Sequence, residues 1–462
     1  MLSAGTAFAA VASADAPHLD GAALGLLWGL PFAGILLSIA LFPLFAPHFW
    51  EHHFGKVSAF WGLAFLVPFA LMFGVELTLY SVLHTALLEY IPFIILLFAL
   101  FTVAGGISLK GTLPGTPLAN TVMMAIGTGI ASWMGTTGAS MLLIRPILQA
   151  NLWRKKVVHI VVFFIFLVSN IGGSLTPLGD PPLFLGFLKG VEFFWTTTHL
   201  FAETVTLALP LLALFFLIDS YYYRKEADVP APPALKGHLG VEGLVNVVLL
   251  AAIVGAVLMS GIWEPGISFS VYHNEIPLQN LVRDVLLVAI ALLSLRLTPK
   301  TAHESNAFSW GPMLEVAKLF ASIFLTIVPV IAILRAGPDG ALRSVVALVT
   351  DASGAPNNAM YFWLTGALSS FLDNAPTYLV FFNLAGGEAN RLMYELPLTL
   401  AAISAGAVFM GANTYIGNAP NFMVKAIAES RGVKMPSFFG YMAWSVGVLI
   451  PLFLICTVLF FS

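Results

Sequence analysis

The sequence has 462 residues, of which 59% are hydrophobic and only 9% are charged, and its mean hydropathy is +0.93. Soluble globular chains carry about a quarter charged residues, so this composition excludes that class and predicts an all-α polytopic membrane protein. The formal net charge of −3 gives no sign of a nucleic-acid partner, and the single Cys456 excludes an intramolecular disulfide and a cysteine-based metal site.

The chain begins with a segment of small and apolar residues, MLSAGTAFAAVASADA. It contains A-x-A patterns but lacks the basic region that precedes the apolar part of a secretory signal peptide. We therefore expect residues 1–22 to form an extracytoplasmic tail, and cleavage of residues 1–16 is left open.

About ten apolar stretches follow that are long enough to cross a bilayer. They lie at roughly 24–45, 57–79, 86–109, 157–188, 200–222, 241–262, 277–297, 313–335, 396–427 and 438–461. Two more, 117–150 and 357–387, are interrupted near their middles and can each hold two half-length helices. The sequence thus predicts about 10–12 transmembrane segments.

The basic residues indicate the orientation, because cytoplasmic loops are enriched in Lys and Arg. With the N-terminus outside, the cytoplasmic loops hold Lys56, Lys110, Arg154, Lys155, Lys156, Arg224, Lys225, Lys236, Lys300, Arg431 and Lys434. The opposite loops hold only Lys189, Arg343 and Arg391, with Arg283 and Arg335 at their edges. This asymmetry predicts a multi-pass protein of a bacterial inner membrane with a periplasmic N-terminus, provided that 117–150 and 357–387 are re-entrant hairpins.

The polar, proline-rich segment 223–240 is expected to be a cytoplasmic linker between two halves, 23–222 and 241–462. The halves share a motif: GSLTPLGDPPLF at 173–184 aligns with GANTYIGNAPNF at 411–422, an offset of 238 residues (411 minus 173). By the charge count the two halves enter the membrane in opposite directions. We therefore predict two inverted repeats, an architecture of many secondary transporters.

Each repeat is predicted to hold a hairpin, 117–150 or 357–387, and a broken helix, 157–188 or 396–427. Proline and glycine stop a helix and leave backbone groups without partners, and in a membrane an ion or a polar substrate can supply those partners. The candidate binding residues are Thr136, Thr137, Ser140, Ser174, Thr176 and Asp180 in the first half and Asp373, Asn374, Thr377, Asn413, Thr414 and Asn418 in the second. Their oxygen atoms are hard ligands, which suit small hard cations such as Na⁺.

Intramembrane carboxylates are costly and default to a functional role. Asp373 is the leading candidate for ion or proton binding, with helix capping as the alternative, whereas Asp180 fits either role equally. Glu89 and Glu315 are expected to form structural pairs, with Lys318 one helical turn from Glu315 as its partner. The lone His159 is expected to be structural.

Three motifs carry a resemblance to a known family: NIGGSLTPLGDPP at 170–182, SSFLDNAPTYLVF at 369–381 and GANTYIGNAPNFMVKAIAE at 411–429. They resemble the ion transporter superfamily that contains sodium–proton antiporters of the arsenite-pump-like type, arsenite efflux permeases, citrate–metal symporters and dicarboxylate carriers. The resemblance implies a homodimer with a scaffold part and a mobile transport part. The sequence departs from the antiporter branch at 135–140, GTTGAS, where an Asp-Asn pair is usual.

These observations predict a secondary active transporter that exchanges Na⁺ for H⁺ by an alternating-access, elevator-like mechanism. The alternative is a cation-coupled citrate or dicarboxylate carrier or an arsenite-type anion carrier. A channel is a further alternative, and an intramembrane enzyme is disfavoured because no paired nucleophile and base motif is present. We expect membrane lipid and a small ion or small organic anion as partners, no cofactor, and no metal beyond transported Na⁺.

Overall fold

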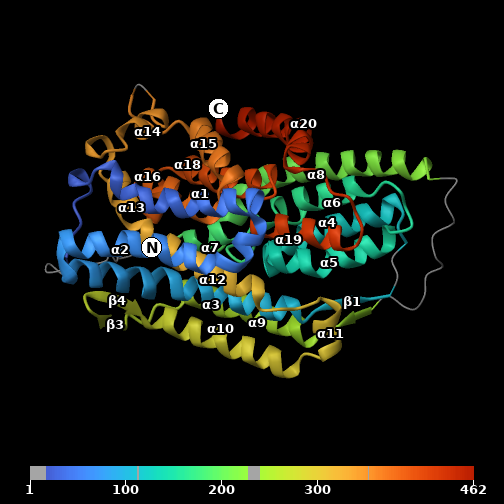
Figure 1. Cartoon of the computed structure of the whole chain (residues 1–462), viewed down its shortest axis with the longest axis horizontal. Coiled ribbons are helices and arrows are strands. Elements are labelled where there is room, and N and C mark those ends of the chain that lie inside the picture. Colours follow the sequence, from blue (N-terminus) through green and yellow to red (C-terminus); the bar gives the residue numbers. More distant parts are fainter. Residues whose placement is uncertain (1–16, 112–113, 227–239, 352) are drawn as a thin grey trace, which may run out of the picture.

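The computed structural model describes residues 17–111, 114–226, 240–351 and 353–462 (Figure 1). Most of the expected tail and of the expected linker lies outside these residues. The described chain is helical apart from two small antiparallel sheets of two strands each. One sheet pairs β1 (Ser108–Lys110) with β2 (Gly240–Glu242), and the other pairs β3 (Ser268–Val271) with β4 (Asn274–Pro277). The prediction of an all-α polytopic membrane protein is confirmed.

The helices of the first half are α1 (Leu30–Phe45), α2 (Pro47–Thr85), α3 (Ile91–Gly105), α4 (Pro117–Met134), α5 (Thr136–Asn151), α6 (Val158–Leu167), α7 (Pro181–Leu188) and α8 (Trp195–Arg224). Those of the second half are α9 (Val245–Ile262), α10 (Leu278–Leu297), α11 (Lys300–Ser305), α12 (Gly311–Thr326), α13 (Val328–Arg335), α14 (Arg343–Leu348), α15 (Asn358–Phe371), α16 (Asn374–Leu384), α17 (Ala389–Tyr394), α18 (Pro397–Met410), α19 (Ala419–Ser430) and α20 (Phe438–Cys456). Short 3₁₀ turns follow α6 and α18, namely η4 (Ile171–Gly173) and η6 (Gly411–Asn413), and a π-helical turn, η3 (Ala86–Tyr90), precedes α3.

Six of the described helices are long and apolar enough to cross a membrane, and α12 with α13, bent by 41°, makes a seventh. The sequence predicts more segments than this because it counts the broken helices and hairpins as spans and divides the helix Pro47–Gly105, one of the six, into two. In the structure, α6 and α18 are apolar but shorter than a full span. The number of full-length spans is therefore lower than the sequence suggests.

The boundary between the expected spans 57–79 and 86–109 was predicted wrongly. The helix runs from Pro47 to Gly105, and its break lies at Gly74, which has φ 85° and ψ 163°. Only glycine adopts this backbone conformation readily. Residues 86–90, the start of the second expected span, continue the helix as a π turn.

Each segment expected to form a hairpin consists of two helices. Gly135, with φ 82°, joins α4 to α5, and Leu372 with Asp373 joins α15 to α16. Each expected broken helix is also interrupted where its prolines and glycines lie, between α6 and α7 and between α18 and α19. The re-entrant course of the hairpins and the inverted orientation of the halves stay predictions.

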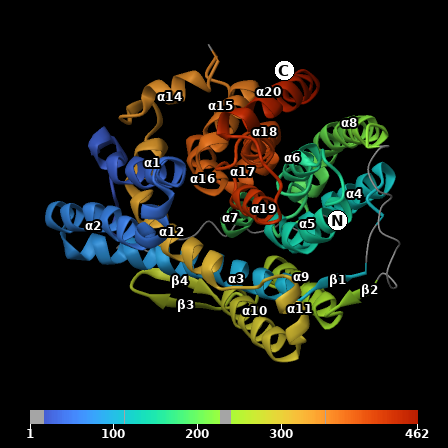
Figure 2. The same cartoon turned by 45° about the vertical axis from the view of Figure 1, so that its right-hand side comes forward.

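The helices form two groups (Figure 2). In the first, α12 packs against α2, and α10 packs against α3 and α9. In the second, the two halves exchange partners: α7 of the first half packs against α16 of the second, and α19 of the second packs against α5 of the first. This exchange brings the interruptions of both broken helices to the same region.

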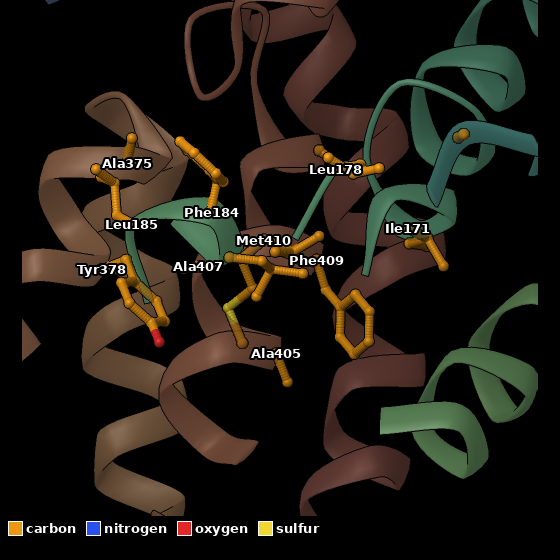
Figure 3. Close-up of a cluster of buried hydrophobic side chains, with 14 of the residues drawn as sticks. Ile171, Leu178, Phe184, Leu185, Ala375, Tyr378, Ala405, Ala407, Phe409 and Met410 are labelled. Carbon is orange, nitrogen blue, oxygen red and sulfur yellow. The ribbon is translucent and has the colours of Figure 1, made fainter. Parts of the chain in front are cut away.

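A layer of buried apolar side chains encloses the interruptions (Figure 3). Phe184 and Leu185 of α7 lie beside Tyr378 of α16, and Met410 lies at the end of α18. The approach of α7 to α16 is close, since a Cβ atom at Gly186 would lie 2.4 Å from the Tyr378 hydroxyl oxygen. This packing keeps lipid away from the polar backbone at the interruptions.

Candidate functional site

The interruptions of the two broken helices contact each other directly. Asn170 Nδ2 donates to Asn421 Oδ1 at 2.7 Å, and Asn418 Nδ2 donates to Asp180 Oδ1 at 3.1 Å. All four side chains are buried. The motifs at 173–184 and 411–422 are therefore not surface loops but the two sides of one polar centre.

Asp180 lies at this centre and is 1% exposed. Its Oδ1 also accepts from Thr136 Oγ1 at 3.0 Å, and its Oδ2 accepts from Asn374 Nδ2. One carboxylate thus contacts both hairpins and the second broken helix. All three donor side chains are neutral, and Asp180 forms no ion pair with any described residue.

Asp373 has the role that the sequence offered as its alternative. Its Oδ1 accepts from the amide nitrogen of Ala375 at 3.0 Å, which makes it the N-cap of α16. Asp180 also precedes a helix, but its side chain makes no capping hydrogen bond to α7. In this structure Asp373 caps a helix, and Asp180 makes the side-chain contacts across the polar centre; ion or proton binding by either carboxylate stays a prediction.

The backbone of each interruption is fixed by a serine from the neighbouring hairpin. Ser132 Oγ donates to the carbonyl of Gly172 at 2.6 Å, and Ser370 Oγ donates to that of Met410 at 3.1 Å. Thr176 and Thr414 in turn donate to the carbonyls of Ser132 and Ser370, respectively. The same pair of bonds thus recurs at the offset of the sequence motif, which supports the alignment of the two segments.

The other predicted residues lie around this centre, most of them in local hydrogen bonds. Ser140 bonds Ser169 at 2.8 Å, Ser174 bonds Thr204 at 2.7 Å, Thr377 donates to the carbonyl of Asp373 at 2.9 Å, and Asn413 donates to Ser370 Oγ at 2.9 Å. Of these four bonds, only that of Thr377 reaches the backbone, and the other three join side chains around the centre. Thr137 is half-buried and faces a cavity.

Two amide oxygens in this region have no partner. Asn374 Oδ1 and Asn413 Oδ1 are both buried and accept no hydrogen bond from a described residue. A buried polar atom without a partner costs free energy unless a ligand satisfies it. An amide oxygen is also a ligand that Na⁺ accepts, so Asn374 can serve a cation beside Asp180.

A cavity of about 110 Å³ opens beside the carboxylate. Asp180, Thr136 and Thr137 form its polar wall, and α3 and α12 supply an apolar wall with residues such as Phe101 and Met313. None of the residues that line it is Lys, Arg or His. It gives a small solute room next to the polar centre, against the faces of two helices of the other group.

Four polar residues of this centre were missed in the sequence: Ser132, Asn170, Ser370 and Asn421. Asn170 precedes the shared segment 173–184, Asn421 lies within 411–422 but aligns with Leu183, and the serines precede the hairpin tips. A buried amide or hydroxyl next to a helix break is the signal that could have found them. Among the described residues, no group of three or more His, Cys, Asp or Glu side chains could hold a resident metal ion.

The remaining charged candidates are structural. His159 Nε2 lies 2.8 Å from Asp219 Oδ1, and Arg154 Nη2 lies 2.6 Å from the same oxygen. Glu89 pairs with Lys189.

The prediction that Glu315 pairs with Lys318 was wrong. Its carboxylate accepts from Trp50 Nε1 at 3.0 Å, and the Lys318 ammonium lies 5.3 Å from the centre of the Phe54 ring instead.

Comparison with known proteins adds the family. No curated protein matches the chain. The model of the family described as “Putative citrate transport” matches residues 21–461, nearly the whole sequence. The chain belongs to this citrate-transport family, and it is a multi-pass membrane protein of the secondary-transporter type.

Proposed function

We propose that this protein is a cation-coupled secondary transporter in which Asp180 binds the coupling cation. The observation that carries the proposal is the state of the Asp180 carboxylate, which is buried, surrounded by neutral donors and free of ion pairs with described residues. A charged group at such depth is costly without a compensating charge. Na⁺ or a proton supplies that compensation.

The side-chain amides around Asp180 suit both a bound Na⁺ and a bound proton. Asn374 and Asn418 now present their N–H groups to the carboxylate. A half-turn of a side-chain amide presents its oxygen instead, which converts a donor into a ligand for Na⁺. A proton on Asp180 needs only one acceptor nearby, and Asn374 Oδ1, which has no partner now, provides one after the same half-turn. Na⁺ and H⁺ then compete for one carboxylate, and this competition couples their movements.

We propose an alternating-access, elevator-like movement for the transport step. The group with α4–α8 and α15–α20 carries the polar centre, and the group with α2, α3, α9, α10 and α12 is the scaffold. Among the described residues, Lys189 after α7 pairs with Glu89 of η3, and Arg335 Nε of α13, the continuation of α12, donates to Asn383 Oδ1 of α16 at 2.9 Å. The homodimer that the resemblance implies belongs to the same proposal.

The proposed cargo is citrate, carried with cations. The family match supports citrate, and the chemistry of the cavity supports its neutralisation by a cation. A bare citrate anion beside Asp180 would meet another carboxylate and no basic side chain among the residues that line the cavity. Citrate with a bound cation avoids this repulsion.

Na⁺/H⁺ antiport is the second candidate, and one observation favours it. The cavity volume of about 110 Å³ and the cation-type ligands serve an ion alone without any further group. In this case the cavity admits hydrated ions, and the organic anion has no part in the cycle.

Purified protein in proteoliposomes distinguishes the two candidates. Labelled citrate is placed outside vesicles loaded with unlabelled citrate, and a second set of vesicles with a pH-sensitive dye receives a pulse of NaCl. Citrate counterflow that requires a cation supports the first candidate, and Na⁺-driven proton movement without citrate supports the second. If neither flux exceeds that of empty liposomes between pH 6 and pH 9, the proposal is wrong.

A further inference from the structure

A second cavity, of about 460 Å³, lies away from the Asp180 centre. It is formed by the segment between α5 and α6, the end of α8, the segment between α19 and α20, and one residue of α20. Five of the residues that line it are basic, namely Arg154, Lys155, Lys156, Arg431 and Lys434, and none of its lining residues is Asp or Glu.

Most of this positive charge has no negative partner in the described part of the chain. Only Arg154 is paired, with the buried Asp219. Glu226 lies nearby, but its Oε1 accepts from the backbone amides of Lys155 and Lys156 at 2.9 Å and not from their ammonium groups. The side chains of Lys155, Lys156, Arg431 and Lys434 are exposed and form no ion pair with a described residue. Four basic side chains, two from each side of the cavity, thus lack an ion pair with any described residue.

The cavity adjoins surface that faces the bilayer. It is bounded by Tyr222 near the end of α8 and by Trp444 of α20, two helices that span the membrane and contact each other. Their outer faces are apolar: Leu217 of α8 is 64% exposed and Val446 of α20 is 56% exposed. In Figures 1 and 2, α8 and α20 lie at the outside of the molecule, and the buried helix α6 packs against α8 and α19 behind them. A molecule in the cavity thus has a basic pocket at one end and lipid-facing helices at the other.

We propose that this cavity binds the phosphate headgroup of an anionic phospholipid, with the acyl chains along α8 and α20. Lys and Arg form short charge-assisted hydrogen bonds with phosphate oxygens, and basic pockets between transmembrane helices on the cytoplasmic side suit such headgroups. Trp and Tyr prefer the same depth, at the boundary of headgroups and chains. A soluble phosphate satisfies the cations but not the apolar surface, so the lipid is the occupant that uses the whole site.

The site joins two elements that reach the Asp180 centre. Its first wall precedes α6, whose other end leads to Asn170, and its second wall follows α19, which begins after Asn418. A headgroup that contacts Lys156 and Lys434 at once would link the far ends of these two helices. The lipid is therefore expected to stabilise the folded protein as well as to bind.

The test uses the full-length protein purified in detergent and measures lipid binding by native mass spectrometry. The probes are cardiolipin, phosphatidylglycerol, phosphatidylcholine and inorganic phosphate. The test variant is Lys156→Gln with Lys434→Gln, one residue from each wall. The matched control is Lys56→Gln with Lys300→Gln, two exposed lysines that are predicted to be cytoplasmic and do not line the cavity.

We expect cardiolipin and phosphatidylglycerol to bind and phosphatidylcholine to bind far more weakly. Each lysine removed from the cavity should weaken anionic-lipid binding about fivefold, and the control pair should weaken it by less than about twofold because distant exposed charges are screened. Equal binding by the test and control variants would overturn the proposal. So would inorganic phosphate that binds as tightly as phosphatidylglycerol and displaces it, because the occupant would then be a soluble anion.

Discussion

Two aspartates with similar surroundings in the sequence have different roles in the structure. Both stand just before a proline-containing helix start, Asp180 before α7 and Asp373 before α16. Asp373 uses its carboxylate to cap the helix, whereas Asp180 gives its carboxylate to Thr136, Asn374 and Asn418. The sequence indicates that both acids lie at breaks, but only the packing of the two halves shows which of them faces the other repeat.

The difference leads to a test with Asp180→Asn. This change removes the charge, keeps the size and keeps an oxygen that accepts from Thr136. We expect the variant to fold and to lose cation-dependent transport by at least about 100-fold in the proteoliposome assay, since the compensating charge of the cation has no partner.

The matched control is Asp373→Asn. Asparagine caps a helix about as well as aspartate, so this variant should keep most of its transport activity. Comparable loss in both variants would show that the two carboxylates act together and that Asp373 is more than a cap.

Gly135 is the single residue that joins α4 to α5 beside the cavity. Its φ of 82° and ψ of 145° are strained for any residue with a side chain, although an added Cβ atom would meet nothing closer than the Leu178 carbonyl oxygen at 3.5 Å. We expect Gly135→Ala to lower the free energy of unfolding by about 1–3 kcal/mol through backbone strain alone. Chemical unfolding in detergent measures this change.

Gly129 in α4 is the control for that substitution. An added Cβ atom at this position meets nothing within 4 Å, and its backbone is helical. Gly129→Ala should leave stability unchanged or raise it by up to about 1 kcal/mol. A loss of stability there equal to that of Gly135→Ala would mean that strain at the joint is not the cause.

A buried ion network connects several elements of the first half. Asp219 of α8 contacts Arg154, His159 of α6 and Asn120 of α4, the last at 2.9 Å. Asp219→Asn leaves the Arg154 guanidinium buried without its partner, so the free energy of unfolding should fall by about 3–5 kcal/mol.

The exposed pair of Lys425 with Glu429, at 2.9 Å, provides the comparison. Glu429→Gln should cost no more than about 0.5 kcal/mol, because solvent screens an exposed pair. Similar losses in the two variants would show that burial does not determine the strength of the network.

At the scale of elements, the distribution of apolar residues predicted that the elements are helices, but it predicted where each helix begins and ends less well. Apolar runs identify the helices, and the prolines and glycines at 173–182 and 411–420 identify the interruptions. The break at Gly74 was not predicted because its direct neighbours Phe73 and Val75 are apolar, and one glycine carries no sign of its φ value. Tertiary contacts, such as those of Ser132 with Gly172, decide where each interruption ends.

At the scale of the whole molecule, the orientation across the membrane rests on the distribution of Lys and Arg. It predicts that the segment around Asp339 is periplasmic and that around Lys300 is cytoplasmic. Both residues are exposed. Cys456 is buried among apolar side chains, so Cys456→Ala should give a background without a reactive thiol.

In this background, Asp339→Cys should react with a membrane-impermeant maleimide added to intact cells. Lys300→Cys should react only after the membrane is permeabilised. The reverse pattern would place the N-terminus in the cytoplasm, and labelling of both from outside would contradict the predicted topology between α11 and α15.

The way the two halves meet could not be predicted from either half alone. The sequence aligns Asp180 with Asn418, yet an alignment does not reveal that the two side chains touch at 3.1 Å. It likewise gives no register for the packing of α7 against α16, which depends on a glycine facing a tyrosine hydroxyl. These contacts arise from side-chain shape at long sequence separation.

The contact between Asp180 and Asn418 implies that these two aligned positions need different residue types. Two aspartates so placed would repel each other or share a proton. Two asparagines would leave the polar centre without a charge. One carboxylate paired with one amide keeps a single negative charge and supplies it with a hydrogen-bond donor. The double substitution Asp180→Asn with Asn418→Asp would keep one carboxylate facing one amide and move the negative charge to the second half of the chain.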